Sequence, residues 1–145
     1  MASISPERPA ESVILVRVDI PAASLHWEEL AEHFEPWLGR YLESVRELSD
    51  AHAGREVRSE GDTAVIAFAT SAQALRFALQ LQEAMGRISW PPGIGELEVR
   101  IGIDRGPLST YHDRETGRTV SHGAALERLA RLARCGHGGQ ILLTG

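Results

Sequence analysis

The sequence predicts an α+β domain with one largely antiparallel sheet and helices packed on one face of that sheet. Three observations lead to this class. The length of 145 residues suits one ordinary domain. The composition, 43% hydrophobic and 24% charged, is typical of a globular protein. Finally, strand-like and helix-like patterns alternate in mixed order, without an internal repeat or a low-complexity tract.

The first third of the chain predicts a leader, a strand and two helical stretches. Residues 1–11 contain two prolines and several charges, and we expect a flexible leader there. Residues 12–20 are apolar and rich in β-branched side chains, which indicates a strand buried on both faces. In residues 25–34 and 36–51 the apolar side chains recur at helical spacing. Pro36 suits the first turn of a helix, so we expect a bend there.

The middle of the chain predicts a hairpin, a helix and a strand. Residues 55–59 and 63–69 form the hairpin around a short Glu-Gly-Asp turn. Residues 71–87 have a broad apolar face at helical spacing and form the clearest helix. A Trp-Pro-Pro-Gly loop at 90–93 precedes a strand over 97–103, in which alternate residues are apolar.

The last third predicts a second, more polar hairpin, a helix and a final strand. The hairpin covers 106–121, with its turn near 113–117. The helix covers 123–135 and ends at a glycine-rich stretch. Residues 140–144 form the last strand.

Charge and cysteine content exclude several kinds of protein. The net charge of -5 argues against non-specific nucleic-acid binding. All 15 basic residues are arginine and the sequence contains no asparagine, so no mechanism can use a lysine amine or an asparagine amide from this chain. The single cysteine, Cys135, forms neither an internal disulfide nor a zinc site alone. Without a signal core or an apolar run of membrane length, a cytoplasmic location and no membrane partner are expected.

Two carboxylates stand at positions that suit metal chemistry. Asp19 ends the predicted buried strand, and Asp62 lies at the tip of the first hairpin. If these strands are neighbours, both side chains emerge at the same end of the sheet. Paired carboxylates there suit Mg²⁺ together with substrate phosphates. The alternative is structural, because aspartate also caps helices and favours turns.

The last predicted helix contains a row of arginines. Arg131 shares a face with Arg128 and with Arg134, at a spacing of three residues. A guanidinium there could bind phosphate. The alternative is a solvated face on which Glu127 and Arg131 form an ion pair one turn apart. The six histidines show no spacing typical of metal ligands.

Four segments, in this order, resemble a known family: VRVDIPAASLHWEEL, GREVRSEGDTAVIAFATSAQALRFALQLQ, LEVRIGIDRGPL and GAALERLARLARCGHGGQILLT. Together they look like the catalytic domain of class III nucleotidyl cyclases, over residues 13–144. The resemblance implies a ferredoxin-like βαββαβ core and a head-to-tail homodimer or heterodimer with active sites at its interface. It also implies conversion of ATP or GTP into a 3′,5′-cyclic nucleotide and pyrophosphate with two divalent metals, Mg or Mn.

The resemblance gives roles to three charged residues. Asp19 and Asp62 match the two metal-binding aspartates of the family. Arg131 matches the arginine that stabilises the transition state, four residues after an asparagine. That asparagine position contains Glu127, whose charge would repel a triphosphate or pair with Arg131.

The nucleotide-binding positions depart from the family pattern. After the first aspartate, family members have a glycine whose backbone approaches the phosphates, whereas Pro21 is followed here by Ala22, Ala23 and Ser24. Arg58 stands at the lysine position that selects the base. Val120 stands at the position of the acid that reads the adenine amino group, and a valine side chain forms no hydrogen bond.

These departures predict a degenerate domain. Losing one preorganised electrostatic group costs about 10²–10³-fold in rate. We therefore expect a regulatory, nucleotide-binding or dimerisation module of bacterial signal transduction. The alternatives are an active cyclase with atypical base recognition, alone or as one half of a heterodimeric site, and an unrelated ferredoxin-like protein. Because family members continue beyond the last strand, we expect residues 12–145 to belong to a longer protein and the C-terminal part to be short.

Overall fold

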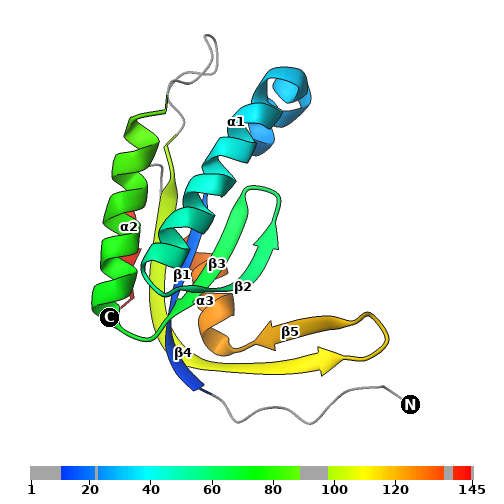
Figure 1. Ribbon diagram of the computed structural model, residues 1–145, viewed down its shortest axis with the longest axis vertical. Helices are drawn as coiled ribbons and strands as arrows, with labels where there is room; N and C mark the ends of the chain where they lie inside the picture. Colours follow the sequence, from blue (N-terminus) through cyan, green and yellow to red (C-terminus); the bar gives the residue numbers. More distant parts are fainter. Residues whose placement is uncertain (1–10, 22, 89–97, 136–138, 145) are drawn as a thin grey trace.

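The computed structural model describes residues 11–21, 23–88, 98–135 and 139–144. Its elements, shown in Figure 1, follow the predicted order closely. They are β1 (Glu11–Asp19), α1 (Ala23–Ala51), β2 (Arg55–Glu60), β3 (Thr63–Phe68), α2 (Ser71–Gly86), β4 (Arg100–Asp113), β5 (Arg118–His122), α3 (Ala124–Leu132) and β6 (Ile141–Leu143).

The described strands form one sheet with the order β2-β3-β1-β4-β5. The central strand β1 pairs antiparallel with both β3 and β4. Near its start β4 also pairs in parallel with β6, and near its end it pairs with β5. A chain order of β1-α1-β2-β3-α2-β4 with β1 between β3 and β4 is the ferredoxin-like βαββαβ arrangement. The predicted fold class is therefore confirmed.

The helices cover both faces of the sheet, so the prediction that all of them lie on one face is wrong for α3. Helices α1 and α2 pack on one face, and α3 lies behind the sheet in Figure 1. Alternate β1 residues enter two separate cores, with Val16 on the α1–α2 side and Leu15 on the α3 side. This arrangement explains the continuous apolar run Val13–Val16 in β1, whose residues alternate between the two cores.

Two predicted breaks do not occur. Helix α1 is a single helix of 29 residues that contains Pro36, although the sequence predicted two stretches. A proline removes one backbone donor, and the long helix tolerates that loss. Strand β4 runs through Gly106 without interruption. A side chain at Gly106 would lie 3.0 Å from Cβ of Ala125, so this glycine allows α3 to pack closely against the strand.

The other elements agree with their predicted bounds within a few residues. The first hairpin turns at Gly61, whose φ of +59° suits glycine. Helix α2 begins with a capping box between Thr70 and Gln73. Strand β1 already begins at Glu11, which the sequence had assigned to the leader. The rest of the predicted leader and the 90–93 loop lie outside the described residues.

Candidate functional site

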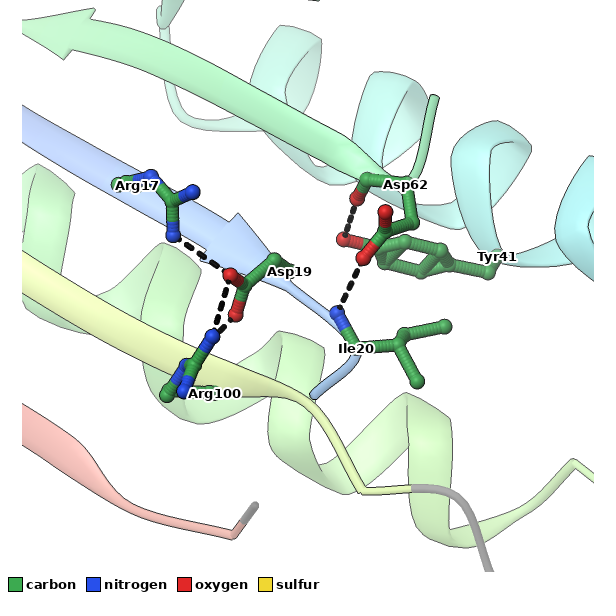
Figure 2. A network of polar contacts seen from close by, with 6 residues as sticks. All are labelled: Arg17, Asp19, Ile20, Tyr41, Asp62 and Arg100. Atoms are coloured by element: carbon green, nitrogen blue, oxygen red, sulfur yellow. Dashed lines mark hydrogen bonds and ion pairs between the residues drawn. The ribbon is translucent and has the colours of Figure 1, made fainter. Parts of the chain in front are cut away.

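At the end of β1, the carboxylate of Asp19 accepts hydrogen bonds from two arginines of its own chain (Figure 2). Arg17 donates from Nη1 to Oδ2 at 2.6 Å. Arg100, at the start of β4, donates from Nε to Oδ1 at 2.9 Å and from Nη2 to Oδ2 at 2.8 Å. The residue is buried, at 4% exposure, and both carboxylate oxygens already accept hydrogen bonds.

The second predicted carboxylate, Asp62, lies beside the same end of β1. Its Oδ2 accepts a hydrogen bond of 2.9 Å from the backbone N–H of Ile20, the residue after Asp19. Its backbone carbonyl accepts a bond of 2.7 Å from the hydroxyl of Tyr41 on α1. These two bonds fix the β2–β3 turn between β1 and α1, as Figure 2 shows. The structure thus brings the two aspartates to one end of the sheet, where the sequence predicted them.

The surroundings of Asp19 and Asp62 shift the pKa values of two neighbouring side chains, Tyr41 and Arg100. Burial raises the pKa of Tyr41 well above 10, and the charges of Asp62 and Asp19 raise it further. The tyrosine is therefore a neutral hydroxyl donor at physiological pH. The hydrogen bond to Asp19 raises the pKa of Arg100, so this guanidinium remains charged.

The arrangement does not fit a divalent cation as it stands. Both Asp19 oxygens are engaged by guanidinium groups. The positive charges of Arg17 and Arg100 balance the negative charges of Asp19 and Asp62, and they would repel a metal ion. Among the described residues, no group of three or more histidine, cysteine, aspartate or glutamate side chains could hold one.

Helix α3 presents the predicted Arg131 and Glu127 to solvent. Both side chains are exposed. No ion pair joins them within the described structure, so the predicted neutralisation of Arg131 by Glu127 is not formed. Their neighbour Arg128 turns toward the sheet, where its Nε donates to Oδ2 of Asp104 at 2.6 Å.

Sequence reasoning missed the cluster around Asp104. This buried carboxylate accepts bonds from Arg128, from the hydroxyl of Thr144 and from the backbone N–H of Arg105. Burial opposes ionisation, but the bonds from Arg128 and Thr144 outweigh it and lower the pKa of Asp104. The available signal was its place directly after the apolar residues Ile101 and Ile103 in β4, and the expectation of helices on one face only concealed it.

The predicted nucleotide-binding residues lie on several different elements. Val120 pairs with Tyr111 in the β4–β5 hairpin, 11 positions beyond Arg100 along β4. Arg58 is exposed on β2, next to an irregularity of the strand pairing. Ala22 lies outside the described residues. Ala23 begins α1, and Ser24 lies in the first turn of that helix.

Comparison with known proteins identifies the family. The profile described as the adenylate and guanylate cyclase catalytic domain matches residues 6–145. The chain belongs to this family. The match covers nearly the whole chain, as the resemblance of the four segments implied.

Relatives of this cyclase domain occur in much longer proteins. An adenylate cyclase of Podospora anserina is 25% identical over 154 residues, covering 94% of this chain and 7% of the relative. An uncharacterized protein of Mycobacterium tuberculosis is 29% identical over 138 residues, covering 94% of this chain and 44% of that protein. The chain therefore spans less than half the length of these relatives.

Solved cyclase domains share the fold. An adenylate cyclase from Trypanosoma brucei, analysed in its monomeric state, aligns with a TM-score of 0.81 at 23% identity, over 97% of this chain and 74% of that one. The adenylyl cyclase CyaB from P. aeruginosa gives a TM-score of 0.79 at 20% identity, over 97% and 79%. In the part of the chain that the structure describes, no helix is both long and apolar enough to cross a membrane.

Proposed function

We propose that this cyclase homology domain does not cyclise nucleotides and acts as a regulatory, nucleotide-binding or dimerisation module in cytoplasmic signal transduction. The observation that carries this proposal is the ion-paired state of Asp19. A cyclase that uses two divalent metals needs the carboxylates at this end of the sheet free to bind them, whereas Asp19 is bonded through both oxygens to Arg17 and Arg100.

The ion pairs oppose metal entry for two reasons. A metal ion would have to displace guanidinium groups whose side chains are only 19% and 18% exposed, for Arg17 and Arg100. Separating such pairs leaves charges without compensation in a poorly solvated place, which is costly. A divalent cation would also meet two positive charges within hydrogen-bond distance of its carboxylate ligand.

The α3 surface supports the same conclusion. Glu127 and Arg131 are exposed on this helix, one turn apart. An anion at the position where the family has asparagine repels a triphosphate, and Val120 cannot read a base by hydrogen bonding. Each lost electrostatic contact costs about 10²–10³-fold in rate, so several losses together bring turnover close to background.

The proposal includes a second chain. Val120 lies on β5 and pairs with Tyr111, toward the end of β4 that is far from Asp19. Glu127 and Arg131 form no bond to either aspartate within the described structure. We infer that the two groups of residues face one another across an interface between chains. A head-to-tail homodimer, or a heterodimer with another cyclase domain, would provide this interface, and ATP or GTP is the ligand we expect there.

One observation favours the alternative of an active cyclase with atypical base recognition. Asp19 and Asp62 lie at the same end of the sheet, and the bond from Ile20 to Asp62 fixes their spacing. This function would require Mg or Mn at the two carboxylates, after the arginines have moved away.

The two functions are separated by titrating ATP and GTP, each with Mn²⁺, into the purified chain by calorimetry and assaying the same samples for cyclic nucleotide. We expect binding without product. The matched variant is Glu127→Asn with Val120→Asp, which restores two family residues while Arg17 stays in place, and it should also form no product. Product that is formed by the wild type and disappears in Asp62→Ala would overturn the proposal in favour of the active cyclase.

A further inference from the structure

We propose that Arg17 is a built-in cation that occupies the Asp19–Asp62 end of the sheet in place of a divalent metal, and that removing it opens a metal site. This inference rests on the proposed function and deepens it, because it names the residue responsible for the closed site. Its test measures metal binding without nucleotide, so it can fail independently of the proposed lack of cyclase activity.

The position of Arg17 in the sheet is unusual. It lies in the central strand β1, opposite Val65 on β3 and Gly102 on β4. The residues on either side, Val16 and Val18, are completely buried. A charged side chain in such a strand carries a desolvation cost unless it is paired. Its pairing with Asp19 at 2.6 Å compensates the charge.

The side chain also has room to reach this partner. Side chains alternate along a strand, so Arg17 and Asp19 lie on the same face of β1, the face that contains Leu15 and α3. The neighbouring position on β4 is Gly102, which contributes no side chain beside Arg17. The guanidinium can therefore lie along the strand toward Asp19, as Figure 2 shows.

The two arginines bind Asp19 differently. Arg100 contacts both carboxylate oxygens in a bidentate arrangement. Arg17 adds a further bond to Oδ2 from the other side. A carboxylate has about four lone-pair directions, so without Arg17 one of the occupied directions becomes available for a metal.

Removing Arg17 alone changes the charge balance around the two aspartates. Asp19 and Asp62 are neutralised by Arg17 and Arg100, and removing Arg17 leaves one net negative charge. Asp62 contributes a second open ligand, because its Oδ2 accepts the bond from Ile20 while Oδ1 accepts no hydrogen bond from the described residues. Carboxylate oxygens with net negative charge are the ligands that Mg²⁺ prefers, and they also suit Mn²⁺.

The experiment is a calorimetric titration of Mn²⁺ into the nucleotide-free chain, for the wild type and Arg17→Gln. Arg76→Gln is the matched control, because Arg76 is an exposed arginine on α2 and its loss changes the net charge equally. We expect Arg17→Gln to bind one Mn²⁺ at least roughly tenfold more tightly than either the wild type or Arg76→Gln. The double variant Arg17→Gln, Asp62→Asn should lose this gain.

Two outcomes would overturn the inference. The first is equal Mn²⁺ affinity in the wild type, Arg17→Gln and Arg76→Gln. The second is tight binding by the wild type that Asp62→Asn abolishes, which would mean that the arginine does not exclude the metal. If Arg17→Gln does not fold, Arg17→Met keeps the length and apolar character of the chain stem, and the comparison of wild type with Asp62→Asn still tests the inference. This second outcome, in a wild type that forms no cyclic nucleotide, would overturn the inference and leave the proposed function standing.

Discussion

Arg128 on α3 and Asp104 on β4 form an ion pair of 2.6 Å whose carboxylate is almost completely buried. Together with a second bond from Arg128 to the carbonyl oxygen of Arg105, at 3.1 Å, this pair fixes the rotation of α3 on the sheet. Because Glu127 and Arg131 lie on either side of Arg128 in sequence, the pair also determines which surface they present.

Replacing Asp104 should destabilise the fold. Asp104→Ala removes the acceptor of three hydrogen bonds, one of them from the backbone, and we expect a loss of about 2–3 kcal/mol in the free energy of unfolding. Urea denaturation at pH 7 measures this loss. The control is Glu83→Gln, which breaks the exposed pair between Glu83 and Arg87 and should cost less than about 0.5 kcal/mol. Equal effects of the two substitutions would contradict the role of Asp104.

The same carboxylate should make stability depend on pH in the acid range. The pKa of Asp104 is lowered in the fold, so the unfolded chain binds its proton first as the pH falls. The stabilisation is fully present above the unfolded pKa, about 3.9, and is lost as the pH falls through the folded pKa. The free energies of unfolding of the wild type and Asp104→Asn should therefore converge as the pH falls from neutral to acid. A difference between them that stays constant with pH would exclude this linkage.

Tyr41 should not ionise in the folded protein at pH 10. Its pKa is raised well above 10 in the folded protein. The raised pKa adds stability that is fully present below the unfolded pKa and is lost as the pH rises through the folded pKa. The chain has two tyrosines, and in Tyr111→Phe the phenolate absorbance reports Tyr41 alone. We expect that signal to appear only with unfolding. Tyr41→Phe should cost about 1 kcal/mol by removing the bond to Asp62.

Two glycines should respond to alanine in opposite directions. A Cβ at Gly123 would lie 2.5 Å from the carbonyl oxygen of Pro107, and backbone cannot move away cheaply, so Gly123→Ala should destabilise by about 1–3 kcal/mol. A Cβ at Gly39 on α1 meets nothing within 4 Å, so Gly39→Ala should stabilise by about 0.5–1 kcal/mol. Thermal unfolding measures both changes, and the loss in Gly123→Ala tests the packing of α3 on β4.

The sequence predicted most of the elements because their patterns are local. The alternating residues of the β2–β3 hairpin and the apolar face of α2 each depend on a short stretch of chain. The layer of α3 was predicted wrongly because β1 is apolar on both faces. Such a strand does not reveal which helix covers which face. Pro36 was given too much weight as a helix breaker, and the second hairpin was expected to begin at Gly106, whereas one long helix and one long strand run through these positions.

The candidate site was predicted only in part, for a related reason. The positions of Asp19 and Asp62 follow from strand ends, which the sequence shows. The bonds from Arg100 to Asp19 depend on how β1 pairs with β4, across 81 positions of sequence. Arg17 lies only two positions before Asp19 in the same strand, and sequence reasoning overlooked that pair. The Asp104 cluster likewise joins β4, α3 and the residue after β6. Contacts of this kind have no local signature, because each residue alone is an ordinary charged side chain.

The most direct measurement of the central claim is cyclic nucleotide formation from ATP and from GTP by the wild type, with Mn²⁺ and with Mg²⁺, beside Asp19→Asn. The account predicts that the wild type forms no more product than Asp19→Asn, because the carboxylate is already held by Arg17 and Arg100. Metal-dependent product from the wild type that Asp19→Asn abolishes would contradict it, and would show that Asp19 serves a working cyclase.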